Sequence, residues 1–98
     1  MPLYCLHCLD KPEGGAEARA ANRPAHLAWA AGLGEILRMA GPLLNETGAM
    51  VGSVFLVEAA DIGAAKALHA QDPYVTGGVF GHVHINETRW AIGDGKPA

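Results

Sequence analysis

The order of apolar runs and alanine-rich segments is the feature that most limits what this chain can fold into. Four short apolar runs have the length and composition of strands, and two segments have those of helices. The predicted strands are 3–9, 36–44, 50–57 and 79–90, and the predicted helices are 16–33 and 61–71. This βαββαβ order is that of the split βαβ unit of ferredoxin-like domains. We therefore expect an α+β fold in which right-handed crossovers place both helices on one face of a four-stranded antiparallel sheet.

Prolines and one aspartate set the boundaries of these elements. Pro24 is unfavourable inside a helix, so the first helix either begins near Asn22 or kinks at the proline. The Gly41-Pro42 pair interrupts the second predicted strand. Asp61 is a good N-cap for the second helix, and the Asp72-Pro73 pair ends that helix, because the residue before a proline is disfavoured in helical conformation.

Length and charge exclude several classes of protein. The 98 residues are enough for a single domain spanning 1–98, with a loose tail expected at 93–98. The net charge of −3, from 10 acidic and 7 basic side chains, argues against nucleic acid as a partner. No apolar run is long enough for a membrane span, and the first residues do not resemble a signal peptide. With only two cysteines, the default expectation is a reducing, cytoplasmic location.

Both faces of the predicted sheet are apolar, which indicates a second covering layer. In the third strand, Phe55 and Val57 point to one side, whereas Val54 and Leu56 point to the other. The helices cover one face, and a monomer would normally keep the other face polar. The simplest cover is a second copy of the chain, so we predict a homodimer packed sheet to sheet, with larger assemblies left open.

The predicted topology gathers polar and glycine residues at one end of the fold. This end contains the start of the first helix, with His26, and the residue after the second helix, Asp72. It also contains the end of the second strand, the start of the third and the start of the fourth. The corresponding candidates for ligand contacts are Gly41, Pro42, Ser53, Gly78 and Phe80.

An imidazole beside a carboxylate is suited to proton transfer. His26 could act as a base and then as an acid near neutral pH, while Asp72 fixes its tautomer. Arg19 or Arg23 could hold an anionic group, and Ser53 or backbone N–H groups near Gly41 and Gly78 could stabilise developing negative charge. The simpler alternatives are a surface histidine with a local hydrogen bond and an Asp-Pro pair that only ends a helix.

The remaining histidines and the cysteines give weaker indications. Cys5 and Cys8 point to opposite faces of a strand, so they are expected to pack in the structure and not to bind zinc together. His82 and His84 share one face of a strand, and His7 could lie beside them on a neighbouring strand. A polar or interface face is favoured over a three-histidine metal site. His69, near the end of the second helix, is expected to be a favourable cation there.

Five short motifs, in order, resemble the YciI-like (YCII-related) family. They are RPAHL at 23–27, AGPL at 40–43, Gly52-Ser53, DPY at 72–74 and GVF at 78–80. The resemblance extends from Tyr4 to about Trp90. It implies a ferredoxin-like protomer, a dimer of the dimeric α/β-barrel type, and a site whose histidine and aspartate correspond to His26 and Asp72. Tyr74, within the fourth motif, joins Arg23 and the candidates above as an expected ligand contact.

Two hypotheses of function follow, with the first favoured; a third, an oxygenase without cofactor on the same barrel, has no residue in its favour. Relatives include a dehydrochlorinase acting on a chlorinated hydroxyhydroquinone and, in the wider superfamily, muconolactone isomerase. The first hypothesis is an enzyme without cofactor or metal that eliminates from or isomerises a small anionic metabolite by proton transfer at His26 and Asp72. The second is a non-catalytic module that binds or senses a small ligand in the same pocket.

Overall fold

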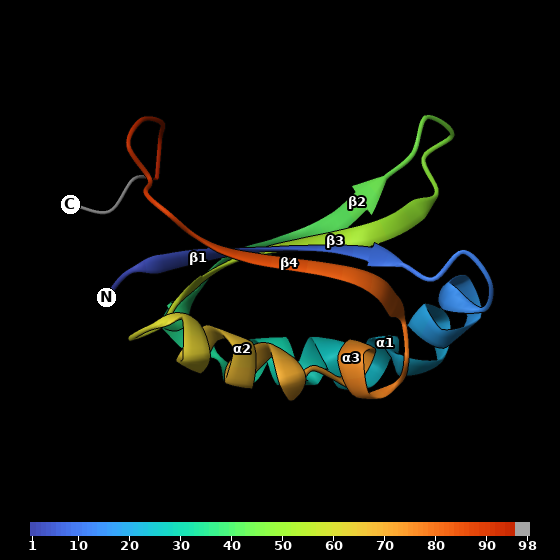
Figure 1. Ribbon diagram of the computed structural model, residues 1–98. Helices are drawn as coiled ribbons and strands as arrows, with labels where there is room; N and C mark the ends of the chain where they lie inside the picture. Colours follow the sequence, from blue (N-terminus) through green and yellow to red (C-terminus); the bar gives the residue numbers. More distant parts are fainter. Residues whose placement is uncertain (96–98) are drawn as a thin grey trace.

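The predicted order of strands and helices is present in the computed structural model, which describes residues 1–95. The strands are β1 (Leu3–Asp10), β2 (Leu37–Leu44), β3 (Met50–Glu58) and β4 (Phe80–Thr88), and the helices are α1 (Gly15–Gly32), the 3-10 turn η1 (Gly34–Ile36), α2 (Ile62–Ala70) and α3 (Pro73–Thr76). The sheet order is β2-β3-β1-β4, and all neighbouring strands are antiparallel. Helices α1, α2 and α3 all lie on one face of the sheet (Figure 1). The ferredoxin-like α+β prediction is confirmed.

Alternation along the two central strands builds the core between sheet and helices. On β1, Tyr4, Leu6 and Cys8 are buried in the core cluster and face the helices. Leu6 lies opposite Phe55 on β3, and Tyr4 lies opposite Val57, so the same face of β3 is buried. The partly buried residues that pack against this cluster are Trp29, Leu37, Leu68, Phe80 and Ile85.

Helix α1 starts earlier than Asn22 and runs through Pro24. It begins at Gly15, after Gly14 adopts a φ of 82° that favours glycine. Pro24 is exposed, as is Ala20, whose carbonyl would be the hydrogen-bond partner of residue 24. Because that carbonyl can be hydrated, the proline is accommodated inside the helix.

The edge strands also differ from the sequence prediction. Strand β2 continues through Gly41-Pro42, because an edge strand has a free side on which proline need not donate a hydrogen bond. Strand β4 ends at Thr88 and begins at Phe80, one residue after the predicted start. Val79 instead closes a turn, in which its N–H donates to the carbonyl of Tyr74 (2.9 Å) and its carbonyl accepts from the N–H of Lys11 (2.8 Å).

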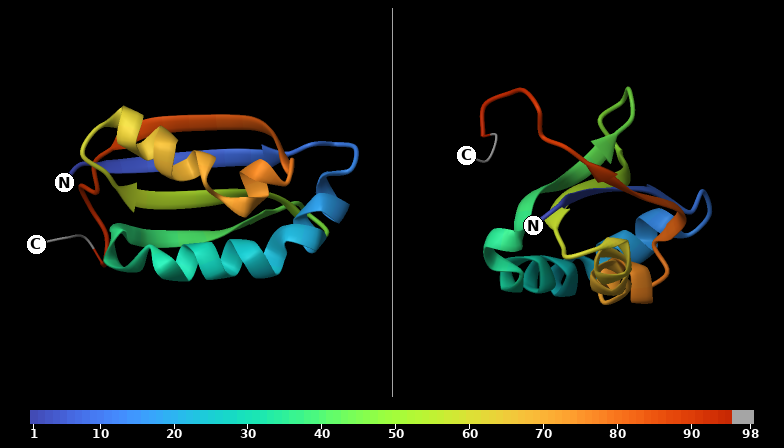
Figure 2. Two further views of the ribbon diagram at one scale, coloured as in Figure 1. Left: turned by 90° about the horizontal axis from the view of Figure 1, so that it is seen from below. Right: turned by 60° about the vertical axis from the view of Figure 1, so that its left-hand side comes forward.

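Asp72-Pro73 ends α2 as predicted, but it also starts the additional one-turn helix α3. The Asp72 carboxylate accepts from the N–H of Tyr74, and Pro73 occupies the first helical position, where its missing N–H costs nothing. Seen from the helix side, α1 runs along one half of the sheet, while α2 and α3 cover the other half (Figure 2). A Cβ at Gly77 would overlap the side chain of Asn22, so glycine permits close packing of α3 against α1.

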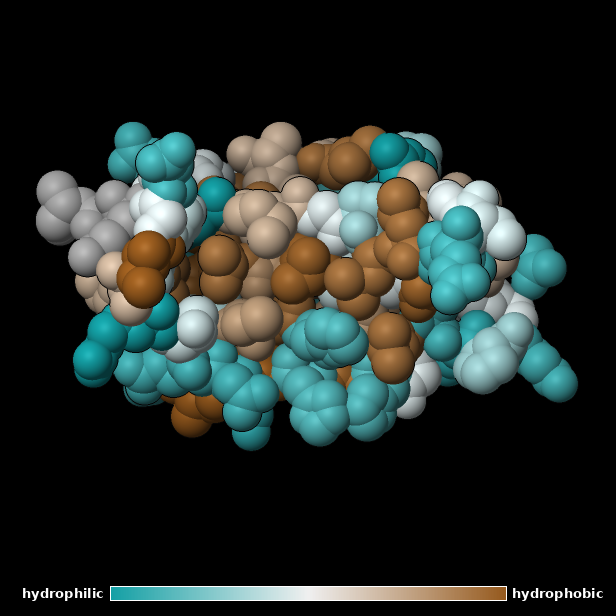
Figure 3. Space-filling view, turned by 90° about the horizontal axis from the view of Figure 1, so that it is seen from above, coloured by the Kyte–Doolittle hydropathy of each residue, from teal (hydrophilic) through white to brown (hydrophobic). Residues whose placement is uncertain are grey.

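The face of the sheet opposite the helices, here called the open face, is apolar across its centre, and polar side chains gather along the lower side of the view (Figure 3). The strand register places Cys5, Leu9, Val54 and Leu56 on it, and Leu9 is 38% exposed. Within residues 1–95, no helix is long and apolar enough to cross a bilayer. Of the predicted loose tail, residues 93–95 form a turn, and residues 96–98 lie outside the described part of the chain.

Candidate active site

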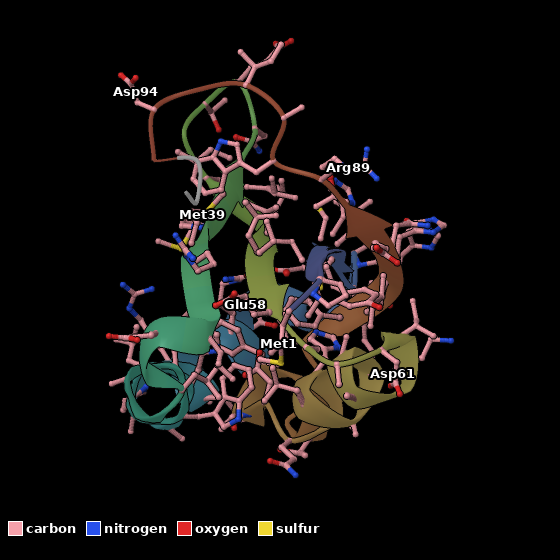
Figure 4. The ribbon with its side chains drawn as sticks, turned by 90° about the vertical axis from the view of Figure 1, so that its left-hand side faces the viewer. Met1, Met39, Glu58, Asp61, Arg89 and Asp94 are labelled. Carbon is pink, nitrogen blue, oxygen red and sulfur yellow. The ribbon has the colours of Figure 1, made fainter. Side chains whose placement is uncertain are left out.

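One stripe of α1 faces a cavity between this helix and the β2–β3 half of the sheet. Arg19, Arg23, His26 and Ala30 follow one another at helical spacing, so they share a face of the helix. The cavity has a volume of about 470 Å³, which is within the range of small-molecule pockets. Its other lining residues are Leu27, Ala31, Leu37, Met39, Ala40, Gly41, Pro42, Ser53, Phe55 and Tyr74. Met39 extends from β2, above α1 (Figure 4).

His26 and Asp72, 46 positions apart in sequence, form a buried hydrogen-bonded pair. The distance from His26 Nδ1 to Asp72 Oδ1 is 2.7 Å. Because a carboxylate can only accept, Nδ1 carries the proton of this hydrogen bond, and in a neutral ring Nε2 is then the acceptor. Asp72 is fully buried, and its Oδ1 also accepts from the N–H of Tyr74 at 2.9 Å. The arrangement presents an oriented imidazole to the cavity.

Aromatic rings enclose this imidazole. The ring of Tyr74 stacks on that of His26 with a centroid separation of 3.8 Å and an interplanar angle of 8°. Phe55 approaches edge-on and Trp29 at a tilt, each with its centroid 6.0 Å away. The His26 side chain therefore cannot swing freely, and a positive charge formed on it would lie against the face of Tyr74.

Arg19 is buried in a second cluster of polar side chains, with Asp10 and Ser53. It is therefore not free to bind an anionic group of a ligand. Its Nε and Nη2 donate to the two carboxylate oxygens of Asp10 at 2.8 and 2.7 Å, and Nη2 also donates to Ser53 Oγ at 3.0 Å. The hydrogen bonds with Asp10 raise the pKa of Arg19 further above its usual value, although burial opposes this. Of the two arginines considered from sequence, only Arg23 is exposed at the cavity with no ion pair in the described residues.

The side chains of Cys8 and His69 form a second buried pair close to Asp72, and both are uncharged. Cys8 Sγ is 3.4 Å from His69 Nε2. Burial, followed by the negative charge of Asp72, raises the pKa of the Cys8 thiol to about 12, so the thiol keeps its proton. Burial also lowers the pKa of His69, despite the opposing effect of Asp72. His69 is thus not the favourable cation expected near the end of α2, and Cys8 is not a reactive thiolate.

Two of the predicted ligand contacts lie away from the cavity wall. Phe80 packs behind Tyr74, edge to face, with a centroid separation of 6.0 Å. Gly78 follows α3 with a φ of 77°, and its N–H donates to the carbonyl of Val75 at 3.1 Å. That N–H is therefore unavailable to a developing oxyanion. The other candidates, Arg23, Gly41, Pro42, Ser53 and Tyr74, all line the cavity.

Sequence patterns did not reveal the pairing of Asp10 with Arg19, and they indicated Arg19 only as an alternative to Arg23. Arg19 and His26 are seven residues apart, which places them on one helix face, and this spacing is visible in the sequence. Asp10 gave no such signal, because it lies at the end of β1, where an acidic residue is usual before a turn.

The open face carries three histidines. His7 lies opposite His84 in the sheet, and the rings of His82 and His84 are 4.4 Å apart between centroids. In the part of the chain that the structure describes, no group of three His, Cys, Asp or Glu side chains is arranged to hold a metal ion. Cys5 and Cys8 point to opposite faces of β1, as predicted.

Residues 2–89, which include every element of the sheet and the whole His26–Asp72 site, match the YCII-related domain. The chain belongs to the YCII-related family. Protein YciI of Escherichia coli O6:H1 and that of Shigella flexneri are each 37% identical to this YCII-related protein over 91 residues, covering 85% of it and 92% of their own length.

A solved structure shares the fold of this YCII-related protein over nearly its full length. It is the 5-chloro-2-hydroxyhydroquinone dehydrochlorinase TftG of Burkholderia phenoliruptrix AC1100, in complex with 2,5-dihydroxybenzoquinone. The two chains are 25% identical, with a TM-score of 0.79 and coverage of 97% and 99%. The family and the fold inferred from the five motifs are thereby confirmed.

Proposed function

We propose that this protein is an enzyme that eliminates from, or isomerises, a small anionic metabolite by proton transfer at His26. The observation that carries the proposal is the 2.7 Å contact between His26 Nδ1 and Asp72 Oδ1. It leaves Nε2 as an acceptor at a cavity wall, which is the geometry of a general base. The likeness to the dehydrochlorinase TftG supports the reaction class.

Proton balance assigns the roles of the two residues. His26 Nε2 takes a proton from the bound metabolite, and the electron pair of the broken bond forms an enolate-like intermediate. In an elimination, this pair expels a leaving group such as chloride, and His26 later releases the proton to solvent. In an isomerisation, His26 returns the proton to another carbon. Asp72 keeps its charge and stabilises the imidazolium, and the reaction consumes no oxidant or reductant.

The residues that line the cavity are suited to a small, partly flat ligand that carries a negative charge. Leu27, Leu37 and Phe55 provide apolar surface beside His26, and Arg23 offers an exposed guanidinium at the rim. We assign Arg23 as the anion clamp, with Gly41 and Pro42 as the wall on β2. The assignment predicts a ligand with a ring-sized apolar body and an anionic group.

A second copy of the chain is proposed as the partner across the open face. Val54, Leu56 and Leu9 give this face an apolar centre, and apolar surface of this kind in a protein of this size is commonly covered by association. The homodimer would cover the sheet on the side opposite the helices, so the cavity beneath α1 remains open to ligand.

Chloride release from 5-chloro-2-hydroxyhydroquinone under anaerobic conditions tests the proposed function. The wild-type protein should release chloride faster than buffer alone, and His26→Gln should reduce the rate by about 10²-fold or more, because general base catalysis typically contributes that much. His69→Gln is the matched control, since His69 is a buried histidine outside the cavity. Equal rates for the wild type and His26→Gln would contradict the proposal. Binding of 2,5-dihydroxybenzoquinone without chloride release would favour the ligand-binding module.

A further inference from the structure

The cavity beside His26 is longer than a single ring requires. Its wall on α1 extends from Arg19 to Ala31, and at a rise of about 1.5 Å per residue this corresponds to roughly 18 Å along the helix. His26 lies between the two ends of this wall. The cavity volume of about 470 Å³ is of the size found for pockets that hold drug-sized ligands. A ring held at His26 therefore leaves part of the cavity to another portion of the ligand.

The two ends of the cavity differ in polarity. Toward the start of α1, the lining includes the polar side chains of Arg19, Arg23 and Ser53. The lining residues of α1 on the other side of His26, toward the end of the helix, are all apolar, namely Leu27, Ala30 and Ala31. Because two of these three residues are alanines, the helix leaves space at this end instead of filling it.

Strand β2 supplies the opposite wall of this end. The chain reverses at η1, so the start of β2 lies beside the end of α1 (Figure 2). Leu37 and Met39, near that start, line the cavity, and Met39 extends above α1 (Figure 4). We call Leu27, Ala30, Ala31, Leu37 and Met39 the apolar end of the cavity. None of these side chains can donate a hydrogen bond.

Two large apolar side chains are exposed at the mouth of the apolar end. Leu27 on α1 is 49% exposed and Met39 on β2 is 44% exposed, and both line the cavity. A single exposed apolar residue is common on protein surfaces, but two that border one cavity are typical of a ligand site. An apolar group placed between them would gain from burial, whereas a polar group would find no hydrogen-bond partner among these side chains.

We infer that the apolar end of the cavity is a subsite for an alkyl chain or a similar apolar substituent on the ring of the ligand. The inference rests on the proposed function, because it takes the ring to lie beside His26. It adds a substrate class, namely a ring that carries an anionic group and also a short apolar chain. Ala30 and Met39 determine this specificity, since Ala30 sets the depth of the subsite and Met39 forms its opposite wall.

Calorimetric titration with two quinones tests the subsite. The first probe is 2,5-dihydroxybenzoquinone, and the second is 3-butyl-2,5-dihydroxybenzoquinone, which has the same ring with a butyl chain added. Each buried methylene group strengthens binding by about three- to fourfold, so the wild type should bind the butyl compound roughly 10²-fold more tightly. A wild type that binds the two probes equally would overturn the inference.

Ala30→Leu should remove the preference for the butyl compound, because the larger side chain fills the subsite. The ratio of the two affinities should fall from roughly 10² to less than about 10. Ala28→Leu is the matched control, since Ala28 is exposed on α1 outside the cavity, and this variant should keep the ratio of the wild type. An unchanged ratio in Ala30→Leu, or an equal fall in Ala28→Leu, would contradict the assignment.

Met39→Ser tests the opposite wall by a substitution at an exposed position. It should lower the ratio by about three- to tenfold through loss of apolar contact, whereas Met50→Ser, at an exposed methionine outside the cavity, should leave the ratio unchanged. Thermal unfolding establishes that each variant is folded. If Met39→Ser keeps the ratio but lowers the mass in sedimentation equilibrium, the apolar end is a contact between copies of the chain, and the inference is overturned.

The inference and the proposed function fail in different measurements. His26→Gln should lose chloride release but keep the ratio of the two affinities, because it leaves the apolar end intact. If the wild type releases chloride but binds both probes equally, the subsite is overturned and the proposed function stands. If the wild type releases no chloride but prefers the butyl compound, and Ala30→Leu loses this preference, the proposed function fails and the subsite stands.

Discussion

At the scale of single residues, His69 shows how burial decides the chemistry of an imidazole. Its place near the end of α2 predicts a cation, because a positive charge is favourable beside free carbonyl groups. The side chain is instead 5% exposed, stacks on Phe80 and contacts Cys8. Desolvation therefore lowers the pKa of His69 below its ordinary value of 6.5.

The lowered pKa of His69 predicts a loss of stability in mild acid. Below pH 6.5 the unfolded chain binds a proton at this residue that the folded chain takes up only at lower pH, so protonation favours unfolding. Urea unfolding between pH 8 and about pH 5 should show a steeper fall in the free energy of unfolding for the wild type than for His69→Leu. Parallel curves for the two proteins would contradict the prediction.

The sequence predicted that His26 and Asp72 meet, because it placed His26 near the start of the first helix, at the same edge as the end of the second. The pair does meet, but His26 lies past the middle of α1 and meets Asp72 where α3 packs against that helix. It could not predict the bonding of individual polar atoms. Whether the N–H of Gly78 is free, or Arg19 is paired, depends on tertiary contacts at distances of about 3 Å. Spacing along a sequence does not resolve those contacts.

At the scale of elements, α3 is the part of the fold that sequence patterns could not reveal. A helix of four residues has no apolar periodicity, and Asp72-Pro73 correctly signalled only the end of α2. This single turn nevertheless places Tyr74 against His26. Longer elements were predicted well, and their errors lie at the ends: β4 is shorter than expected, and α1 begins at Gly15 and not near Asn22.

Gly52 on β3 is required by the close approach of the central strands. A Cβ at this position would overlap the carbonyl oxygen of Cys8 on β1 and press on the side chain of Leu43 on β2. Gly52→Ala should therefore lower the free energy of unfolding by about 1–3 kcal/mol, which is typical of overpacking. Chemical denaturation measures the change.

Gly32→Ala is the matched control for this substitution. Residue 32 is the last of α1, and a Cβ there would meet nothing within 4 Å. Because alanine favours helical conformation by about 0.5–1 kcal/mol over glycine, this variant should be unchanged or slightly stabilised. A Gly52→Ala protein as stable as the wild type would show that β3 can shift away from β1.

At the scale of the whole molecule, the open face predicts the oligomeric state. If two copies pair through this face, Leu56→Asp places a charge in the apolar centre of the interface and should give monomers. Sedimentation equilibrium should then yield a mass of 10.2 kDa for the variant and twice that mass for the wild type. Ala67→Asp, on the exposed side of α2, is the control and should remain dimeric. A monomeric wild type would contradict the proposed partner.

One oxygen atom of Asp72 serves two purposes, since Oδ1 accepts from both the imidazole of His26 and the first turn of α3. Any replacement at this position would alter both the scaffold and the orientation of the proposed base in one step. Divergence toward new ligands within this architecture is therefore expected in the surrounding surfaces, chiefly the rim formed by β2 and the exposed residues of α1. The pair itself is expected to persist while those surfaces drift.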